Sequence, residues 1–235
     1  MIIGSISENK DLEKRISLVP DIIKKYTNLG LEVNIVKGYG DHIGFNDDSF
    51  KNAGAKILSS KEEVMKNSNI LIQLDLINEN DFSFLNKEKI LIGSLNYSQN
   101  KDKIEKLKSI GVNIFSLELL PRITRAQSMD ILSSQANLAG YKAVLEAFAF
   151  FEKAIPMMMT AAGTVPAAKV LVVGAGVAGL QAVATAKRLG AVVFATDVRM
   201  ASKEQVESLG GKFLTVEGSE NLETEGGYAK EASED

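Results

Sequence analysis

The sequence predicts an α/β protein made of two parallel-sheet domains, the second of which is cut short at its C-terminus. Two observations predict this class. From residue 2 to residue 119, short apolar runs alternate with amphipathic segments, which is the pattern of strands joined by helices. After a long helical stretch, the same alternation resumes at Lys169. We therefore divide the chain into an N-terminal domain at 1–133, a connecting helix and linker at 134–163, and a second domain at 164–235.

The N-terminal domain is predicted to contain five buried strands separated by helices. Pro20 suits the first position of a helix, and Gly30 suits its end. Ser60 and Glu63 have the spacing of a capping box, which predicts another helix start. The strands are expected at 2–6, 32–36, 70–74, 90–95 and 113–119, and the helices at 20–30, 47–54, 60–67 and 99–109.

The second domain shows fewer strands than a complete domain of its type. We expect a helix at 134–152, a connector at 157–168, strands at 169–173, 192–196 and 212–216, and helices at 180–189 and 203–209. The acidic tail from Glu217 is predicted to be a loop. A doubly wound domain usually has about six strands. We therefore expect the chain to be a fragment of a longer protein, marginally stable and inactive in isolation.

Composition argues against several classes of protein. The 235 residues are 45% apolar and 24% charged, which is ordinary for a globular protein. There is no cysteine and one histidine, His42, so neither disulfides nor a metal site are expected. A net charge of −3 provides no basic surface for nucleic acid. No signal peptide or membrane span is evident, so the chain by itself is expected to be cytosolic and soluble, without membrane insertion.

A glycine-rich turn marks a candidate site in the second domain. The letters GAGVAG, which begin at Gly174, match G-x-G-x-x-G and lie between an expected strand and an expected helix, as the motif requires. Gly174 allows a tight turn, Gly176 lets a pyrophosphate approach the backbone, and Gly179 lets the helix pack closely. The helix N-terminus, with Val177 and Ala178, presents unpaired N–H groups to phosphates. The alternative is a glycine-rich turn that binds no ligand.

An acidic residue at the end of the next strand indicates which nucleotide binds. Asp197 follows Gly174 by 23 positions, near the spacing of roughly 20 for the carboxylate that binds the adenosine ribose. A carboxylate there repels a 2′-phosphate, so we expect the site to prefer NAD(H) to NADP(H). Arg199 argues the other way, because an arginine can bind a 2′-phosphate, but we give Asp197 more weight. Val198 lies between them and completes the expected contact set.

These stretches, with several others, resemble one protein family. The similarity is to the NAD(H)-binding α component of proton-translocating NAD(P) transhydrogenases, and it covers essentially the whole chain. It is carried by PRITRAQSMDILSSQANLAGY at 121–141, TAAGTVPAAKVLVVGAGVAGLQAVATAKRLGA at 160–191, TDVR, KEQVESLGGKF and GGYAKE. Near the N-terminus only the pattern Glu13-x-Arg15-x-x-Leu18-x-Pro20 is distinctive, and alanine dehydrogenases share it.

The resemblance implies that the polar stretch after residue 121 forms a loop over the nicotinamide. By motif position, the implied nicotinamide and ribose residues are Arg122, Gln127, Asp130 and Ser133. A carboxamide offers one acceptor and two donors, which these side chains can match. The alternative is a capped loop-to-helix junction, with Ser133 or Ser134 as the N-cap and Asp130 favouring the helix dipole.

The resemblance also implies a mobile loop at 225–235 that closes over bound nucleotide. Tyr228 would lie on the adenosine side, and the flanking glycines suit a hinge. The family often has methionine where Ala232 stands, so this chain departs from the pattern there. The alternative is a frayed acidic terminus.

The implied reaction is direct hydride transfer from NADH on this chain to NADP⁺ on a partner domain. Such a transfer needs two aligned nicotinamide rings and excluded water, and it needs no acid or base. The implied partners are an NADP(H)-binding subunit, membrane subunits that translocate protons, and a second copy of the chain in a homodimer. The implied location is the cytoplasm, peripheral at the inner face of the cytoplasmic membrane.

Two other functions stay open. Alanine dehydrogenases share the architecture and use a lysine and a histidine to bind and protonate a keto acid. Gln73 and Asn96 stand near those positions here, and neither does acid–base chemistry near neutral pH. Arg15 is retained, and we interpret it as structural. The other function is a non-catalytic NAD(H)-binding module, with residues 157–159, three methionines, as an adaptable contact surface.

Overall fold

The computed structural model describes residues 1–121 and 123–215. The chain forms two compact units, Met1–Asp130 and Ile131–Asp235, each of which is described by itself. This division falls three residues before the boundary that the sequence suggested. None of the helices in the described ranges is long and apolar enough to cross a membrane.

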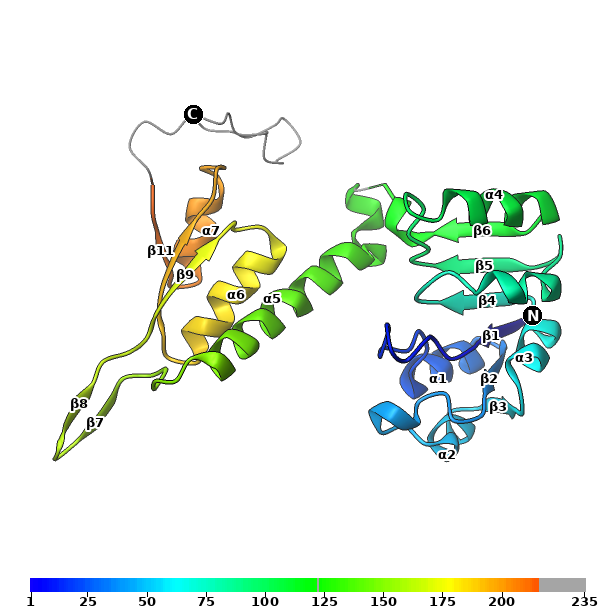
Figure 1. Cartoon of the computed structure of the whole chain (residues 1–235), viewed down its shortest axis with the longest axis horizontal. Helices are drawn as coiled ribbons and strands as arrows, with labels where there is room; N and C mark the ends of the chain where they lie inside the picture. Colours follow the sequence, from blue (N-terminus) through cyan, green and yellow to red (C-terminus); the bar gives the residue numbers. More distant parts are fainter. Residues whose placement is uncertain (122, 216–235) are drawn as a thin grey trace. The chain divides into compact units, whose positions relative to one another are not determined.

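The first unit is built on a six-stranded parallel sheet (Figure 1). Its strands are β1 (Ile2–Ser5), β2 (Glu32–Val36), β3 (Ala55–Leu58), β4 (Ile70–Gln73), β5 (Ile90–Gly93) and β6 (Asn113–Ser116). Their order is β3-β2-β1-β4-β5-β6, and all neighbours run parallel. This doubly wound order is that of the Rossmann fold, and it reverses between β1 and β4, where such sheets bind ligands beyond the strand ends.

Helices cover both faces of this sheet and create two separate cores. They are α1 (Pro20–Asn28), α2 (Asp47–Asn52), α3 (Lys61–Asn67) and α4 (Lys101–Ile110). Strand side chains alternate between faces, and β4 shows the consequence. Its Leu71 joins the core that includes residues of α3 and α4, whereas Ile70 and Ile72 pack against the core that includes residues of α1 and α2.

Short 3₁₀ helices complete the first unit. They are η1 (Asp41–Ile43), η2 (Glu79–Phe84), η3 (Leu117–Leu119) and η4 (Thr124–Met129). The run expected as one strand at 113–119 therefore ends at Ser116 and turns into η3. Glu118 explains this turn, because its carboxylate accepts hydrogen bonds from the Leu95 and Tyr97 N–H groups at 3.2 and 3.0 Å.

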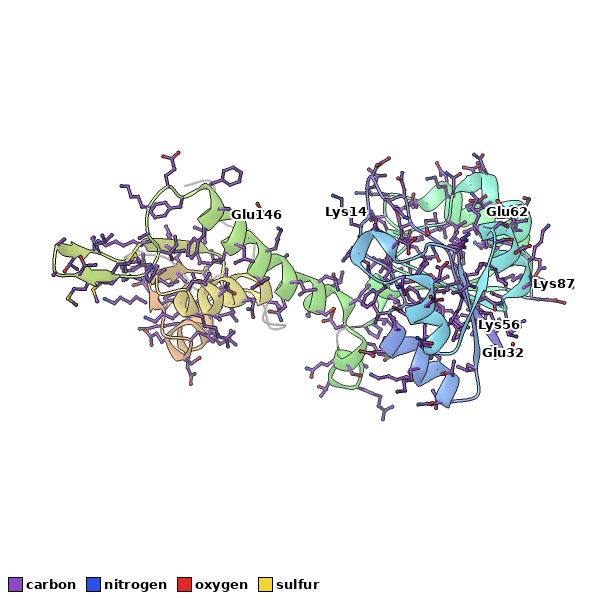
Figure 2. The ribbon with its side chains drawn as sticks, turned by 90° about the horizontal axis from the view of Figure 1, so that it is seen from below. Lys14, Glu32, Lys56, Glu62, Lys87 and Glu146 are labelled. Atoms are coloured by element: carbon purple, nitrogen blue, oxygen red, sulfur yellow. The ribbon has the colours of Figure 1, made fainter. Side chains whose placement is uncertain are left out.

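The sequence analysis missed strand β3, which forms the edge of the sheet. β3 pairs with β2 through Asn34 and Lys56 and their neighbours. The Lys56 ammonium also lies 2.5 Å from the Glu32 carboxylate on the neighbouring strand, and both residues are marked in Figure 2. With only four residues and one of them charged, β3 has too little alternation to stand out from the loop after α2.

The second unit contains a three-stranded parallel sheet in the order β11-β10-β9. Its elements are α5 (Ile131–Phe150), β9 (Lys169–Val173), α6 (Val177–Arg188), β10 (Val192–Thr196), α7 (Ser202–Ser208) and β11 (Lys212–Phe213). Helix α6 packs against both α5 and α7 (Figure 1). These elements share one core, in which Val144 of α5 meets Ala175 and Val183. The predicted α/β class with parallel sheets is confirmed.

The connector expected at 157–168 contains an antiparallel hairpin. Its strands are β7 (Met158–Thr160) and β8 (Gly163–Val165), and all their residues are exposed. Helix α6 starts three residues earlier than predicted, directly after the glycine-rich turn. The predicted tail from Glu217 and the mobile loop with Tyr228 lie outside the described residues.

Candidate dinucleotide site

The glycine-rich turn joins the end of β9 to the start of α6. Gly174 has φ +92°, a left-handed conformation that glycine adopts without strain. Its N–H donates to the Thr196 carbonyl of the next strand at 2.9 Å. A Cβ at Gly174 would meet nothing within 4 Å. The turn therefore requires glycine here for its backbone angle and not for space.

The other two glycines of the motif are required for space. Gly176 is the N-cap of α6, and a Cβ added there would find only the Arg199 Nη2 atom nearby, at 3.9 Å. The space in front of the helix N-terminus is thus open. A Cβ at Gly179 would lie 1.8 Å from the Gly174 carbonyl oxygen, so α6 can sit this close to the turn only without a side chain. An open, N–H-lined helix start fits a pyrophosphate.

Asp197 connects this turn to the end of β10. Its carboxylate accepts a hydrogen bond from the Ala175 N–H at 2.6 Å. It also accepts from the backbone N–H, Nε and Nη2 of Arg199, each at 2.9 Å. The Arg199 guanidinium lowers the pKa of Asp197 to about 2, and the two N–H bonds act in the same direction. Asp197 is therefore a carboxylate at neutral pH, and Arg199 is already paired with it.

Two apolar residues border this cluster. Val177, the first residue of α6, and Val198, between Asp197 and Arg199, are both exposed. Ala178 follows Val177 and is half-buried. The structure thus brings the eight sequence-predicted residues of the turn and the β10 end into one place. Among the described residues, no group of three or more His, Asp or Glu side chains could hold a metal ion.

Helix α5 supplies a contact that the sequence analysis missed. A Cβ at Gly140 would lie 2.0 Å from the Ala178 carbonyl oxygen, so α5 touches the first turn of α6 directly. Four residues later Val144 is buried in the core of the unit. The one available signal was a single glycine inside an otherwise strong helical pattern, which usually has a packing reason.

The expected nicotinamide residues lie around the start of α5. Gln127 is exposed in η4, Asp130 directly precedes α5 and is half-buried, and Ser133 is half-buried in its first turn. Because α5 begins at Ile131, neither Ser133 nor Ser134 can be its N-cap, which corrects that alternative. The Ser134 hydroxyl instead donates to the Ile131 carbonyl at 2.9 Å. Arg122 and Tyr228 lie outside the described residues.

A second polar cluster lies at the carboxyl ends of β1 and β4 in the first unit. Gln73 is buried, and its carbonyl oxygen accepts from the Ile6 N–H at 2.9 Å and the Ser5 hydroxyl at 3.1 Å. Its amide nitrogen donates to the Ile6 carbonyl and the Glu8 carboxylate, each at 3.2 Å. Every polar group of Gln73 therefore has a partner within the fold.

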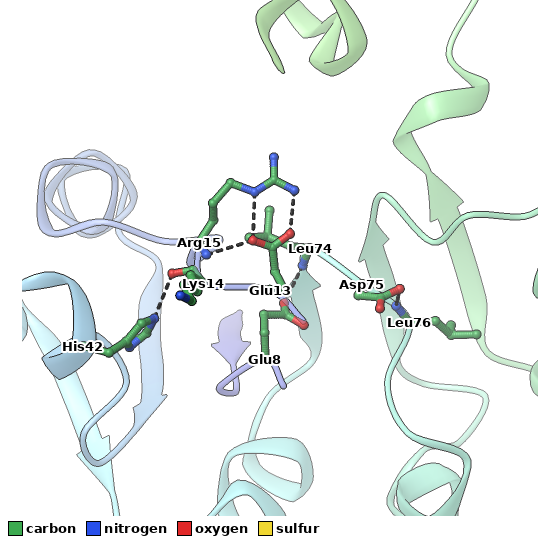
Figure 3. Close-up of polar contacts among 8 residues, drawn as sticks. All are labelled: Glu8, Glu13, Lys14, Arg15, His42, Leu74, Asp75 and Leu76. Atoms are coloured by element: carbon green, nitrogen blue, oxygen red, sulfur yellow. Dashed lines mark hydrogen bonds and ion pairs between the residues drawn. The ribbon is translucent and has the colours of Figure 1, made fainter. Parts of the chain in front are cut away.

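Glu8 borders Gln73 and closes this strand end (Figure 3). Its carboxylate accepts from the Leu74 N–H at 2.6 Å. Burial raises the pKa of Glu8 to about 7, and the negative charges of Asp75 and Glu13 act in the same direction. Glu8 thus titrates near neutral pH in the folded protein.

The loop after β1 is held by its own contacts (Figure 3). The Arg15 guanidinium lies 2.6 Å from the Glu13 carboxylate, and this pairing lowers the pKa of Glu13. His42 forms a 2.8 Å hydrogen bond with the Lys14 carbonyl, a contact between distant loops and not the local one expected. Asn96 is exposed with φ +52°, and its amide donates to Gln99 at 2.9 Å.

Comparison with known proteins identifies relatives along the whole chain. Residues 4–139 match the family described as alanine dehydrogenase/PNT, N-terminal domain, and residues 143–232 match its C-terminal domain. The first of the chains that make up the NAD(P) transhydrogenase subunit alpha of Rhodospirillum rubrum is 48% identical over 242 residues, covering 100% of this chain and 63% of that protein. This chain therefore spans just under two thirds of that relative.

Two further comparisons separate the family's branches. The crystal structure of a transhydrogenase from Sinorhizobium meliloti superposes with a TM-score of 0.87 at 45% identity, covering 92% of this chain and 64% of that one. Alanine dehydrogenase 1 of Staphylococcus aureus is 26% identical over 145 residues, covering 62% of this chain and 38% of that protein. The chain is more similar to the transhydrogenases than to this alanine dehydrogenase.

Proposed function

The chain belongs to the alanine dehydrogenase/PNT family, and from this premise we propose that it is the NAD(H)-binding component of a proton-translocating NAD(P) transhydrogenase. The proposed reaction is hydride transfer between NADH on this chain and NADP⁺ on a partner domain. Membrane subunits of the same complex would couple the transfer to proton translocation. The relatives named as transhydrogenase subunits support this assignment.

The residues of the second unit fit a bound dinucleotide. We propose that the pyrophosphate lies against Gly176 and the first N–H groups of α6, and that Asp197 receives the adenosine ribose hydroxyls. The ionised carboxylate disfavours a 2′-phosphate, and Arg199 is less available to bind one because it is paired with Asp197. Both facts support NAD(H) as the nucleotide held by this chain.

The remaining proposed contacts orient the nicotinamide. Bound NADH supplies the hydride, so the chain has to hold the ring at a fixed angle and exclude water. We assign this role to Arg122, Gln127, Asp130 and Ser133, whose amide, carboxylate and hydroxyl groups match a carboxamide and a ribose. Tyr228 would contact the adenosine side. None of these groups has to donate or accept a proton during the transfer.

The state of Gln73 is the observation that carries the proposal. An amino-acid dehydrogenase needs an acid–base group beside its keto acid. Near the position where alanine dehydrogenases have a lysine, this chain has a buried amide whose donors and acceptor are all used within the fold. Arg15 is likewise engaged with Glu13. The first unit thus lacks the lysine that an alanine dehydrogenase uses, which favours transfer to a second nucleotide.

The hairpin β7–β8 supports the homodimer that the family resemblance implies. Met157, Met158, Met159 and Val165 are between 47% and 71% exposed on a two-stranded element. Two-stranded hairpins are marginal on their own, and exposed flexible methionines favour an adaptable apolar contact. We propose that a second copy of the chain covers this hairpin.

A two-component transfer assay tests the proposed function. The full-length protein is mixed with the NADP⁺-loaded partner component, NADH is added, and NADPH formation is followed. Rapid transfer that falls strongly in Gln127→Asn or Asp130→Asn, with the exposed Asp48→Asn as control, is the expected result. NADH binding without transfer would favour the non-catalytic module. Reduction of a keto acid by NADH and ammonium would favour the alanine dehydrogenase alternative.

A further inference from the structure

One face of α5 carries apolar residues in its second half and polar residues in its first half. Gly140, Val144 and Phe148 repeat every four residues, and all three pack on the second unit, with Gly140 against Ala178. Residues three, four and seven apart lie on the same face of a helix. Ser133 and Asn137 therefore continue this face toward the start of α5.

This polar half extends past the start of α6. Gly140 meets the second residue of α6, so the residues before Gly140 lie beyond the end of α6 that faces the glycine-rich turn. Figure 1 shows the first half of α5 continuing past α6 in this direction. At about 1.5 Å per residue, Asn137 is about 4.5 Å and Ser133 about 10.5 Å beyond Gly140 along the helix axis.

The adenosine half of a dinucleotide would leave the turn on the other side. Asp197 ends β10, and α7, which follows it, packs against α6 and β11. Helix α5 packs on α6 from its β9 side, and Figure 1 draws α6 between α7 and α5. A dinucleotide with its adenosine ribose at Asp197 and its pyrophosphate at Gly176 would extend its nicotinamide half toward α5.

We propose that Asn137 binds the nicotinamide-side ribose, and that Gly140 sets its height above the pyrophosphate. This inference rests on the proposed dinucleotide site. Asn137 is exposed and forms no hydrogen bond with any described residue, and its amide offers two donors and an acceptor for ribose hydroxyls. It lies between the pyrophosphate and Ser133, which is where the ribose joins phosphate to nicotinamide.

Binding of two nucleotides to the full-length protein tests the role of Asn137. NADH contains the nicotinamide half, and ADP lacks it. Asn137→Ala is compared with wild type and with Leu138→Ala, which changes an exposed residue on the opposite face of the same helix. Alanine favours helix, so neither variant should disturb α5. Dissociation constants are measured by calorimetry and melting temperatures are recorded alongside.

We expect Asn137→Ala to weaken NADH roughly threefold to tenfold, the loss of one or two hydrogen bonds, while ADP affinity stays within about twofold. Leu138→Ala should leave both affinities unchanged. Equal weakening of NADH and ADP, or no change in either, would overturn the role of Asn137 and leave the dinucleotide site standing. If wild-type protein binds neither nucleotide, the dinucleotide site itself is wrong.

Discussion

At the scale of single residues, Asp197 is the most heavily hydrogen-bonded group of the candidate site. Its two oxygens accept four N–H groups, one from Ala175 and three from Arg199. A carboxylate has about four acceptor positions. A ribose hydroxyl must therefore share or displace one of these donors, and the Arg199 guanidinium, at the surface, is the donor that can move.

The depressed pKa of Asp197 predicts a pH-dependent stability contribution. Its pKa falls from 3.8 to about 2 in the folded protein, so the stabilisation is present above the unfolded pKa and is lost as pH falls through the folded one. We expect Asp197→Asn to lower the free energy of unfolding at pH 7 and pH 5 by similar amounts. The difference from wild type should shrink between pH 4 and pH 2.

Urea unfolding at several pH values measures this difference, with Asp48→Asn in an exposed surface pair as the control. A difference that does not depend on pH below 4 would show that the ion pair with Arg199 does not form in solution.

Glu8 predicts the opposite dependence in the first unit. Burial raises its pKa from 4.5 to about 7, so between these values the folded protein keeps a proton that the unfolded chain has released. Wild-type stability should therefore fall as pH rises from about 5 to about 7. Glu8→Gln keeps an acceptor for the Leu74 N–H and carries no charge, so it should match wild type at pH 5 and exceed it at pH 8.

Melting temperatures of Glu8→Gln and of the exposed Glu88→Gln at both pH values decide the matter. If Glu8→Gln destabilises equally at pH 5 and pH 8, then its carboxylate is ionised throughout this range.

At the scale of elements, α3 depends on a buried lysine from outside the helix. The Lys89 ammonium donates to the carbonyls of Met65, Lys66 and Ser68 at 2.8, 2.8 and 2.5 Å, which closes the C-terminal end of α3. Desolvation lowers the pKa of Lys89. Lys89→Met should cost about 2–3 kcal/mol of unfolding free energy, because it leaves these carbonyls without their donor.

Chemical denaturation of Lys89→Met and Lys87→Met provides the comparison, since Lys87 is exposed and projects outward in Figure 2. Equal stability of both variants would mean that water satisfies the end of α3.

The contact between α5 and α6 is the second element-scale feature open to test. In Gly140→Ala the new Cβ would lie 2.0 Å from the Ala178 oxygen, so α5 must move away from the start of α6. We expect a loss of about 1–3 kcal/mol in stability, as for other overpacked contacts. NADH binding should weaken more than ADP binding, because only the nicotinamide half reaches α5.

Leu138→Ala is again the control, with thermal unfolding and calorimetry as the measurements. A stable Gly140→Ala protein with unchanged NADH affinity would mean that the height of α5 above α6 has no influence on binding.

Elements with strong local patterns were predictable, and those defined by tertiary contacts were not. The helix start at Pro20 and the strands at 32–36, 169–173 and 192–196 were predicted with the bounds that the structure gives. Strand β3 was missed because its pairing with β2 defines it. The capping box was half right, because Ser60 accepts from the Glu63 N–H whereas the Glu63 carboxylate accepts from Ser59.

Across the whole molecule, the candidate site was predictable only where a short motif encodes it. The spacing of Gly174, Gly176 and Gly179 identified the turn, because each backbone requirement falls within six residues. The pairing of Asp197 with Arg199 and the contact of Gly140 with Ala178 depend on how strands and helices meet. No local pattern encodes such contacts, which is why sequence reasoning treated Arg199 as a free cation and overlooked Gly140.

The distribution of cores predicts that the first unit folds by itself. Two of the three hydrophobic cores lie wholly within Met1–Asp130, and the third lies wholly within the second unit. The six strands of the first sheet also come from this unit alone. We therefore expect residues 1–130, produced alone, to unfold in one cooperative transition. Because the glycine-rich turn belongs to the second unit, NADH should not shift the melting temperature of this piece.

Circular dichroism melts of residues 1–130 and of the full-length protein, with and without NADH, test both statements. A ligand at a hundred times its dissociation constant stabilises its binding domain by about 2.7 kcal/mol, so the full-length protein should show a clear shift. A gradual melt of residues 1–130 would mean that the second unit is needed to complete its cores. An NADH-induced shift in residues 1–130 would move the nucleotide site to the strand ends around Gln73 and Glu8.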